Sequence, residues 1–149
     1  MEDRELALKV AWGFLGVPYR WAGNDPMAGF DCSGFIVEIL KSTGHLSRNT
    51  DLTANGLFQR FYLNGKQIAD PYKGCLVFWG DKIGGIVTQA YHVEMCVDCF
   101  RSIGASGGGG NTVTVQDAIE ADAYIKVRPF SSRVPICGFA DPFSKALTF

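Results

Sequence analysis

A cysteine at the predicted start of a helix is the strongest chemical signal in the sequence. Cys32 lies in the segment Phe30-Asp31-Cys32-Ser33-Gly34-Phe35, directly before apolar residues at helical spacing. Backbone N–H groups and the helix dipole favour negative charge at a helix N-terminus, so we expect the pKa of the Cys32 thiol to be lowered. A thiolate that attacks an amide carbonyl also needs a proton donor for the leaving amine. The pattern therefore favours a cysteine hydrolase, provided that a histidine reaches Cys32.

Two histidines are available as that proton donor, His45 and His92. His45 follows the predicted Cys32 helix by a full helix length, and at about 1.5 Å per residue it would lie roughly 20 Å from Cys32. His92 lies in the predicted strand 91–97, and a strand that faces a helix N-terminus can supply a Cys–His pair. Either residue alone is more often an inert buried side chain, but a thiol at a helix start meets the condition for reactivity. We therefore expect His92 to be the partner of Cys32.

Three helices are predicted to position these residues. Apolar residues recur at helical spacing over residues 4–15, 32–43 and 52–61. Asp31 is the expected N-cap of the second helix, and Gly44 is expected to end it. The segment 16–31 contains three glycines, two prolines and three aromatic residues. Because those aromatic side chains would not all stay in water, we expect a structured loop that leads into Cys32.

Short strands are predicted in the second half of the chain, in apolar and β-branched runs bounded by turn residues. These runs cover residues 75–79, 91–97, 102–106, 112–115 and 124–127. Helices followed by strands are typical of an α+β domain with an antiparallel sheet. The length of 149 residues fits one domain, residues 1–149. The glycine-rich stretch 104–110 lacks the Gly-Lys-Ser/Thr of a phosphate-binding loop, so we expect a hairpin or a cleft rim there.

Composition excludes several other classes of protein. Hydrophobic residues make up 47% and charged residues 19% of the chain, which excludes intrinsic disorder. The formal net charge is −1. Because no basic excess is available to neutralise phosphates, nucleic acid is not an expected partner. The apolar runs are far shorter than the about 18 residues of a membrane-spanning helix, so we expect no membrane segment.

The cysteines indicate neither an extracellular protein nor a metal site. An odd count of five is atypical of a secreted disulfide framework, and the charged N-terminus has no apolar signal-peptide region. We therefore expect a cytoplasmic or a phage- or virion-associated protein. Cys96 and Cys99 form a C-x-x-C pair, but a structural zinc site needs four ligands, and only the distant Cys75 and Cys137 remain. We expect no metal and no cofactor.

Several segments closely resemble the signature of the NlpC/P60 family of cysteine peptidases. They are, in order, Gly16-Val17-Pro18-Tyr19-Arg20-Trp21-Ala22-Gly23, Gly29-Phe30-Asp31-Cys32-Ser33-Gly34-Phe35, Gly74-Cys75-Leu76-Val77-Phe78-Trp79 and Tyr91-His92-Val93. The resemblance covers residues 4–128 of the chain. It implies a papain-like α+β fold with N-terminal helices packed on an antiparallel sheet. It also implies hydrolysis of cell-wall peptides, usually at the bond between the γ-carboxyl of D-glutamate and a diamino acid.

The resemblance also implies roles for individual residues. Cys32 would be the nucleophile and His92 the base. Four other residues of the motif around the nucleophile are expected to bind substrate or to form the oxyanion site: Tyr19, Trp21, Asp31 and Ser33. The backbone N–H of Cys32 is a natural oxyanion donor, because the first amides of a helix have no partner within it. The alternative for Tyr19 is a core aromatic with a bonded hydroxyl.

The third member of the catalytic group departs from the family pattern. The family carries a polar residue, often histidine, on the next strand about a dozen positions after the catalytic histidine, where this chain has Gly104. Ser106 shares the face of Gly104, and Glu94 shares the face of His92, where the family usually has glycine. A backbone carbonyl is a third option. The sequence therefore leaves three candidates for the group that orients His92: Ser106, Glu94 and a backbone carbonyl.

The expected function is a metal-independent cysteine hydrolase that cuts peptidoglycan stem peptides. One alternative is a papain-like amidase or acyltransferase that acts on another amide or ester. A second is a catalytically silent module that binds wall peptides, because the third catalytic position is vacant. A peptidoglycan peptide is the expected partner, and the sequence does not indicate an oligomeric state.

Overall fold

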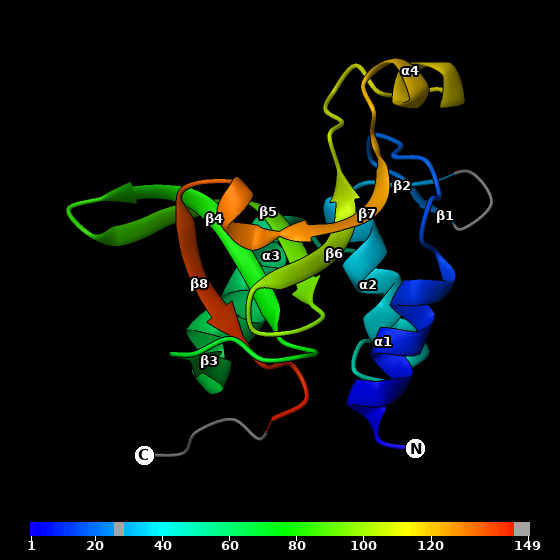
Figure 1. Cartoon of the computed structure of the whole chain (residues 1–149). Helices are drawn as coiled ribbons and strands as arrows, with labels where there is room; N and C mark the ends of the chain where they lie inside the picture. The colour runs from blue at the N-terminus through cyan, green and yellow to red at the C-terminus, as the bar shows by residue number, and fades with distance from the viewer. Residues whose placement is uncertain (26–28, 145–149) are drawn as a thin grey trace.

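A computed structural model describes residues 1–25 and 29–144 of the chain. The main helices and strands are α1 (Asp3–Gly13), β1 (Asn24–Asp25), β2 (Gly29–Phe30), α2 (Cys32–Ser42), α3 (Ala54–Leu57), η1 (Phe58–Lys66), β3 (Gln67–Ile68), β4 (Leu76–Ile83), β5 (Ile86–Cys96), β6 (Arg101–Ser106), α4 (Val115–Glu120), β7 (Tyr124–Pro129), η2 (Phe130–Ser132) and β8 (Ile136–Ala140). Figure 1 shows α1 and α2 beside a twisted sheet, with the β4–β5 hairpin and α4 projecting from it.

The larger sheet is antiparallel and has the strand order β3-β8-β4-β5-β6-β7. Together with the helices it confirms the predicted α+β fold. The predicted strands at 75–79, 91–97, 102–106 and 124–127 correspond to β4, β5, β6 and β7. The strand β8, which was not predicted from the sequence, lies between β3 and β4 in the sheet.

The predicted strand at residues 112–115 was wrong, because this segment leads into α4. The Thr114 hydroxyl accepts a hydrogen bond from the Asp117 N–H, with 3.1 Å between the two heavy atoms. The Asp117 carboxylate accepts one in return from the Thr114 N–H, also at 3.1 Å. This reciprocal pair satisfies N–H groups that a helix start leaves without partners. The capping interaction therefore outweighs the β propensity of the two valines in the segment.

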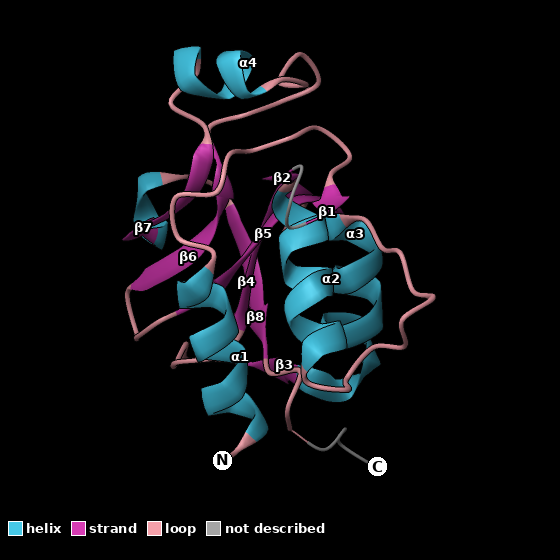
Figure 2. Ribbon diagram, turned by 90° about the vertical axis from the view of Figure 1, so that its right-hand side faces the viewer, coloured by secondary structure: helices cyan, strands magenta, loops and turns pink. Residues whose placement is uncertain are grey.

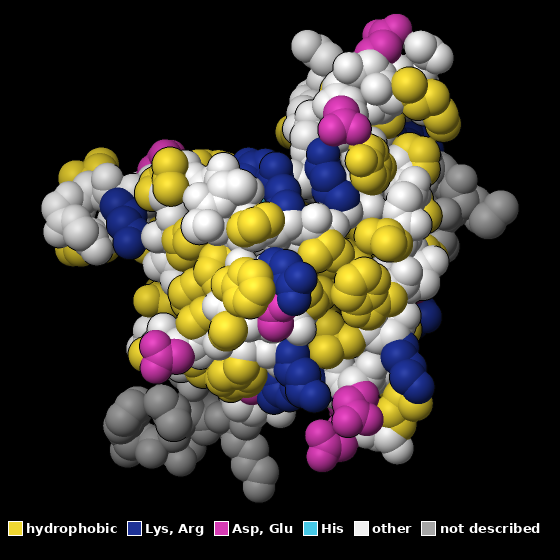
Figure 3. All heavy atoms as spheres, in the orientation of Figure 1, with side chains coloured by type: hydrophobic (Ala, Val, Ile, Leu, Met, Phe, Trp, Pro, Cys, Tyr) yellow, Lys and Arg dark blue, Asp and Glu magenta, His cyan; other side chains and the backbone are white. Residues whose placement is uncertain are grey.

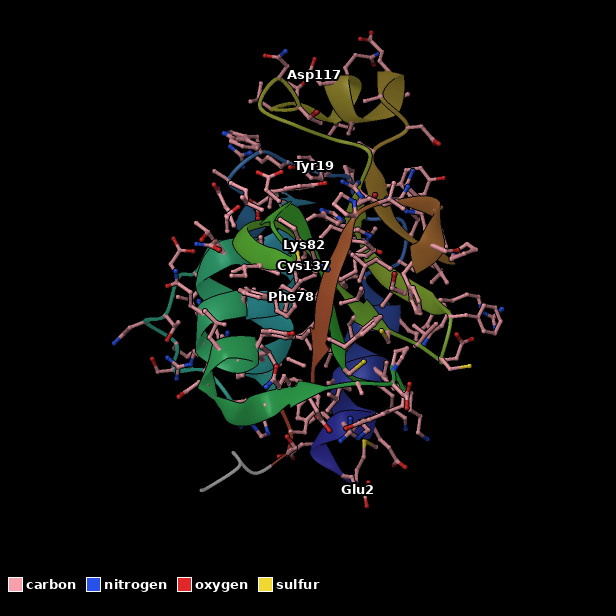
Figure 4. The ribbon with its side chains drawn as sticks, turned by 90° about the vertical axis from the view of Figure 1, so that its left-hand side faces the viewer. Glu2, Tyr19, Phe78, Lys82, Asp117 and Cys137 are labelled. Carbon is pink, nitrogen blue, oxygen red and sulfur yellow. The ribbon has the colours of Figure 1, made fainter. Side chains whose placement is uncertain are left out.

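The three predicted helices are confirmed, and they cover one face of the sheet (Figure 2). The third one begins at Ala54, where the Thr53 hydroxyl caps the Gly56 N–H at 3.0 Å, and it continues through η1. Phe78 of β4, labelled in Figure 4, packs edge-on against Phe58 of η1 with 5.3 Å between the ring centroids. Burial of such side chains between the layers supplies the main stabilisation of the fold. No helix within the described residues is long and apolar enough to cross a lipid bilayer.

A smaller apolar cluster occupies the opposite face of the sheet. Its buried members are Cys75, Val77, Trp79 and Cys96. The partly buried side chains that cover them are Ile68, Phe130, Ile136 and Phe139. The connection from β7 to β8 therefore crosses this face instead of leaving it in water.

The strands β5 and β6 diverge toward one end of the sheet. Their pairing within the described residues consists of Met95 with Ile103 and Cys96 with Ser102. The start of α2 reaches the gap that this leaves, because the backbone N–H of Val93 hydrogen-bonds the Cys32 thiol. The divergence thus brings the start of α2, on one face of the sheet, to the same opening as His92, which β5 presents on the opposite face.

Candidate active site

Asp31 begins α2 and thereby places Cys32. Its carboxylate accepts a hydrogen bond from the Gly34 N–H, with 2.7 Å between oxygen and nitrogen, which confirms the predicted N-cap. The Asp31 N–H in turn donates to the Gly23 carbonyl at 3.0 Å. A β-carbon at Gly34 would collide with that carbonyl, so glycine is what lets the preceding loop lie against the helix start. Cys32 is the first residue of α2 and is partly exposed.

An open cleft of about 440 Å³ contains both Cys32 and His92. Its walls come from the loop before α2, the start of α3, β5, the turn after β6 and the β7–β8 connection. The lining residues are Tyr19, Trp21, Ala22, Asp31, Cys32, Ser33, Thr53, Ala54, Tyr91, His92, Ala105, Gly107, Gly108, Gly109 and Arg133. The structure therefore brings all four expected substrate residues to the same opening as the Cys–His pair. The glycine-rich stretch forms part of the cleft rim, as expected.

His92 is buried and hydrogen-bonded to Glu94, with 2.7 Å between Nε2 and Oε2. The other Glu94 oxygen accepts a hydrogen bond from the buried Ser102 hydroxyl at 2.8 Å. The Arg128 guanidinium of β7 lies 3.8 Å from Oε2. Both carboxylate oxygens are thus held in place, and the His92 nitrogen that remains for proton exchange is Nδ1.

Gly104 provides the room that Glu94 needs. A β-carbon at Gly104 would collide with the Cβ, Cγ and Cδ atoms of the Glu94 side chain. Glu94 is almost fully buried, at 1% exposure, so the collision could not be relieved by a simple shift of the side chain into solvent. Gly104 therefore stands where the family pattern expects a polar residue, and the Glu94 side chain from the neighbouring strand occupies the space that such a residue would need.

Ser106 has different partners from those expected of an orienting residue. Its hydroxyl accepts hydrogen bonds from the guanidinium groups of Arg128 and Arg133, the second at 3.4 Å. In the described part of the chain His92 bonds Glu94 and not Ser106. Of the two side chains left open by the sequence, the geometry brings Glu94 to the imidazole.

The environment of Cys32 raises the pKa of its thiol to about 11. Burial is the largest cause, and the Asp31 and Glu94 carboxylates act in the same direction, whereas the N–H groups of Val93 and Ser33 lower the pKa. The direction is opposite to the lowering expected from the helix start, because removal of the thiolate from water outweighs the amide dipoles. Cys32 is therefore a neutral thiol near pH 7 when the cleft is empty.

Burial also lowers the pKa of the His92 imidazole, and the positive charges of Arg133 and Arg128 lower it further, against the opposing effect of Glu94. Burial raises the pKa of Glu94, but its hydrogen bonds to His92 and Ser102 and the Arg128 charge leave that pKa below its usual range. Near neutral pH Glu94 is thus ionised and His92, which lines the cleft, is neutral. An Nε2–H that donates to the carboxylate leaves Nδ1 unprotonated, as a general base requires.

The four expected substrate residues line the cleft in different ways. Tyr19 is buried, and burial raises the pKa of its hydroxyl, so it stays a neutral donor. Figure 4 shows Tyr19 between the upper end of the sheet and α4. Trp21 is 52% exposed, which suits a platform for substrate better than a core residue. The Ser33 hydroxyl donates to the Asp31 carboxylate at 3.3 Å, so both serve the helix start as well as the cleft wall.

Three lining residues with polar side chains were not predicted from the sequence: Thr53, Tyr91 and Arg133. Thr53 is the N-cap of α3, and Tyr91 directly precedes His92. Helix-capping and strand patterns could therefore have indicated these two. Arg133 lies between β7 and β8, outside every motif, and only the folded chain brings it to the cleft.

The two cysteines of the C-x-x-C pair lie in different environments. Cys96 is buried and its thiol is hydrogen-bonded to that of Cys75, whereas Cys99 is exposed in the turn between β5 and β6. Among the described residues no three His, Cys, Asp or Glu side chains form a candidate metal site.

N-terminal helices packed on an antiparallel sheet, with Cys32 and His92 in one cleft, define a papain-like α+β protein. The chain belongs to the NlpC/P60 family, whose family model matches residues 16–129. The matched segment contains Cys32, His92 and Glu94. Arg133 lies beyond its end.

Similar proteins include two curated relatives and many solved structures. Protein P54 of Enterococcus faecium is 32% identical over 102 residues, which cover 68% of this chain and 18% of that protein. The bifunctional muramidase/DL-endopeptidase CwlT of Bacillus subtilis (strain 168) is 28% identical over 109 residues, 73% of this chain and 31% of that protein. The crystal structure of the NlpC/p60 domain of the peptidoglycan hydrolase SagA has a TM-score of 0.61 at 24% identity and covers 93% of this chain and 97% of that one. The chain thus spans less than a third of the length of the two curated relatives.

Proposed function

We propose that the chain is a cysteine endopeptidase that hydrolyses peptidoglycan stem peptides, with Cys32 as nucleophile and His92 as general base. The observation that carries the proposal is that a thiol at a helix start and a buried imidazole bonded to a carboxylate line the same cleft. Family membership and the likeness to CwlT, named as a DL-endopeptidase, favour a wall peptide as the substrate. The bond proposed for cleavage joins the γ-carboxyl of D-glutamate to a diamino acid.

The neutral resting state determines the first step. As Cys32 Sγ attacks the substrate carbonyl, its proton passes to Nδ1 of His92, and the Glu94 carboxylate on Nε2 stabilises the imidazolium. The ion pair forms during the attack, because burial disfavours a thiolate in the empty cleft. Glu94 is proposed as the orienting residue, since it holds both the tautomer and the ring angle of His92.

Two donors are proposed for the oxyanion of the tetrahedral intermediate. The backbone N–H of Cys32 is the first, because it begins α2 and has no acceptor within the helix. The Tyr19 hydroxyl is the second, because it lines the cleft and stays protonated. Both are fixed by surrounding structure, so they need little rearrangement when the negative charge develops.

The remaining steps return the site to its starting state. His92 gives its proton to the leaving amine, and the C–N bond breaks to leave a thioester on Cys32. A water molecule then loses a proton to His92 and adds to the thioester carbonyl. The C–S bond breaks, the proton returns to the Cys32 sulfur, and the product leaves with a new carboxylate.

Mass spectrometry of purified muropeptides after digestion tests this function. The expected products are a peptide that ends in D-glutamate and a fragment that begins with the diamino acid. Cys32→Ala is expected to abolish cleavage, and Cys99→Ser, at an exposed cysteine outside the cleft, is the matched control. Intact muropeptides with the wild-type protein would contradict the proposal, and transfer to an added amine instead of water would favour an acyltransferase.

A further inference from the structure

The connection from β7 to β8 brings a cation to the cleft from outside the segment that the family model matches. Arg133 follows η2 and lines the cleft together with Cys32 and His92. Its backbone carbonyl accepts a hydrogen bond from the Trp79 indole N–H at 2.9 Å. Its guanidinium carbon lies 5.9 Å from the centroid of the Trp79 ring. The backbone and the side chain of Arg133 are thus both anchored on one buried aromatic residue.

The Arg133 guanidinium has no carboxylate partner among residues 1–25 and 29–144. Its one side-chain hydrogen bond there is the 3.4 Å contact of Nη2 with the Ser106 hydroxyl. Its Nε is buried without any hydrogen-bond partner. The neighbouring Arg128 differs, since it lies 3.8 Å from the Glu94 carboxylate. A guanidinium that lines the cleft without a carboxylate partner would be stabilised by a charged acceptor that enters the cleft.

Arg133 and His92 lie on the same side of the cleft, because both contact the Trp79 ring. The Trp79 ring that Arg133 covers packs against the His92 imidazole, with 5.1 Å between the centroids. Figure 3 shows basic side chains along the upper edge of the sheet, between the β4–β5 hairpin and the part of the chain that carries α4. His92 is the residue that protonates the leaving amine in the proposed mechanism. A group next to His92 is therefore placed to contact the leaving half of the substrate.

We infer that Arg133 binds a carboxylate of the diamino acid that leaves, and so selects wall peptides in which that residue is not amidated. A guanidinium presents parallel N–H donors that match the two oxygens of a carboxylate. The inference rests on the proposed function, because it assumes that the leaving residue lies beside His92. It extends that function by specifying the charge state of the substrate on one side of the scissile bond.

Two matched tripeptides test the inference. Both are L-alanyl-γ-D-glutamyl-meso-diaminopimelate, one with free carboxylates on the diamino acid and one with both amidated. The wild-type protein is expected to prefer the free acid by about 10- to 100-fold in kcat/KM, as a charge-assisted pair allows. Arg133→Gln is expected to remove most of the preference and Arg133→Lys to keep part of it. Arg60→Gln, at an exposed arginine of η1, should leave the preference unchanged.

The ratio between the two substrates separates recognition from a purely structural role. If Arg133 only supported Trp79 and Ser106, Arg133→Gln would slow both tripeptides equally and leave their ratio unchanged. That result, or a wild-type protein that cleaves both tripeptides equally well, would overturn the inference while the proposed function stands.

A binding measurement keeps the test independent of turnover. Calorimetry with Cys32→Ala is expected to show tighter binding of the free acid than of the amide, and the addition of Arg133→Gln should abolish the difference. If neither tripeptide is cleaved by the wild-type protein, the proposed function fails for this bond. The inference then depends on the calorimetry alone, and equal binding of the two tripeptides would overturn it.

Discussion

The Glu94 side chain fills the space into which any side chain at Gly104 would extend. The two residues lie on neighbouring strands, β5 and β6, at the end where those strands are no longer paired. In the pattern that the sequence resembles, the strand of β6 carries a polar residue and the position of Glu94 carries glycine. Here the polar group comes from β5 instead, and it reaches the same imidazole. The two positions are therefore coupled by sterics, because a β-carbon at Gly104 would collide with the Glu94 side chain.

Glu94→Gln is expected to lower kcat by about 10²- to 10⁴-fold, because an amide does not stabilise the His92 imidazolium as a carboxylate does. The acidic limb of the kcat/KM profile should move to lower pH. The Glu94 carboxylate raises the pKa of His92, so its neutralisation lowers the pH above which the base is unprotonated. Steady-state kinetics across the pH range measure both effects. Ser106→Ala is the matched comparison and should change turnover by no more than a few-fold, since Ser106 bonds arginines.

Gly104→Ala is expected to reduce activity at least tenfold and to destabilise the protein by about 1–3 kcal/mol, because the added methyl overpacks a filled site. Denaturant unfolding and kinetics on the same preparation report the two changes. Near wild-type behaviour in both would mean that Glu94 has room to move aside.

The double variant Glu94→Gly, Gly104→His moves the polar side chain from β5 to β6 and places glycine at the position on β5. A histidine from β6 would then have the space that Glu94 vacates. Partial recovery of turnover, relative to Glu94→Gly alone, is expected. A double variant that is no more active than Glu94→Gly, although folded, would argue against a shared orienting position.

Alkylation by iodoacetamide in the absence of substrate reports the ionisation of Cys32. The pKa of about 11 predicts slow labelling near pH 7 and a rate that rises tenfold per pH unit toward that value. Cys99→Ser should serve as the background, because Cys99 is an exposed thiol that would otherwise react first. A labelling rate that is already constant below pH 7 would instead indicate a thiolate–imidazolium pair in the free protein.

Ser102→Ala should destabilise the fold by about 1–3 kcal/mol, because it removes the hydrogen bond to a buried carboxylate oxygen. The pKa of Glu94 lies below its usual range in the folded protein, so its contribution to stability is present above pH 4.5 and is lost as the pH falls through the folded value. Ser102→Ala raises that folded pKa, and acid unfolding should begin at a higher pH. Urea titrations between pH 3 and 7 measure the shift, and Ser102→Thr should restore most of the stability.

Local sequence signals were sufficient to place Cys32 at the start of a helix. The pattern from Asp31 to Gly34 is a capping signal whose partners lie within four residues, so Cys32 could be placed at a helix start before any tertiary contact was known. His92 followed by elimination, because only one of two histidines lay within reach. The same kind of local evidence would have identified the start of α4 if Thr114 and Asp117 had been interpreted as a capping box.

The choice between Glu94 and Ser106 could not be predicted, because both share the face of His92 in a regular sheet. The strands β5 and β6 diverge after two residue pairs, and this divergence decides which side chain crosses the gap. The role of Arg133 was equally hidden, since its position depends on how the β7–β8 connection crosses the sheet. The strand β8 was missed because Gly138 interrupts a short apolar run, and its pairing partners are distant in the sequence.

The proposed nucleophile and the proposed base come from different layers, with Cys32 on a helix and His92 on the sheet. Each layer keeps its own backbone hydrogen bonds, but the distance between thiol and imidazole depends on how α2 packs on β5. A partial opening that lifts the helix from the strand would separate the pair without melting either element. Reversible inactivation at denaturant concentrations below the main loss of circular dichroism is the expected sign of such an opening. Loss of activity would then reveal the separation of the two layers at a lower denaturant concentration than the loss of secondary structure does.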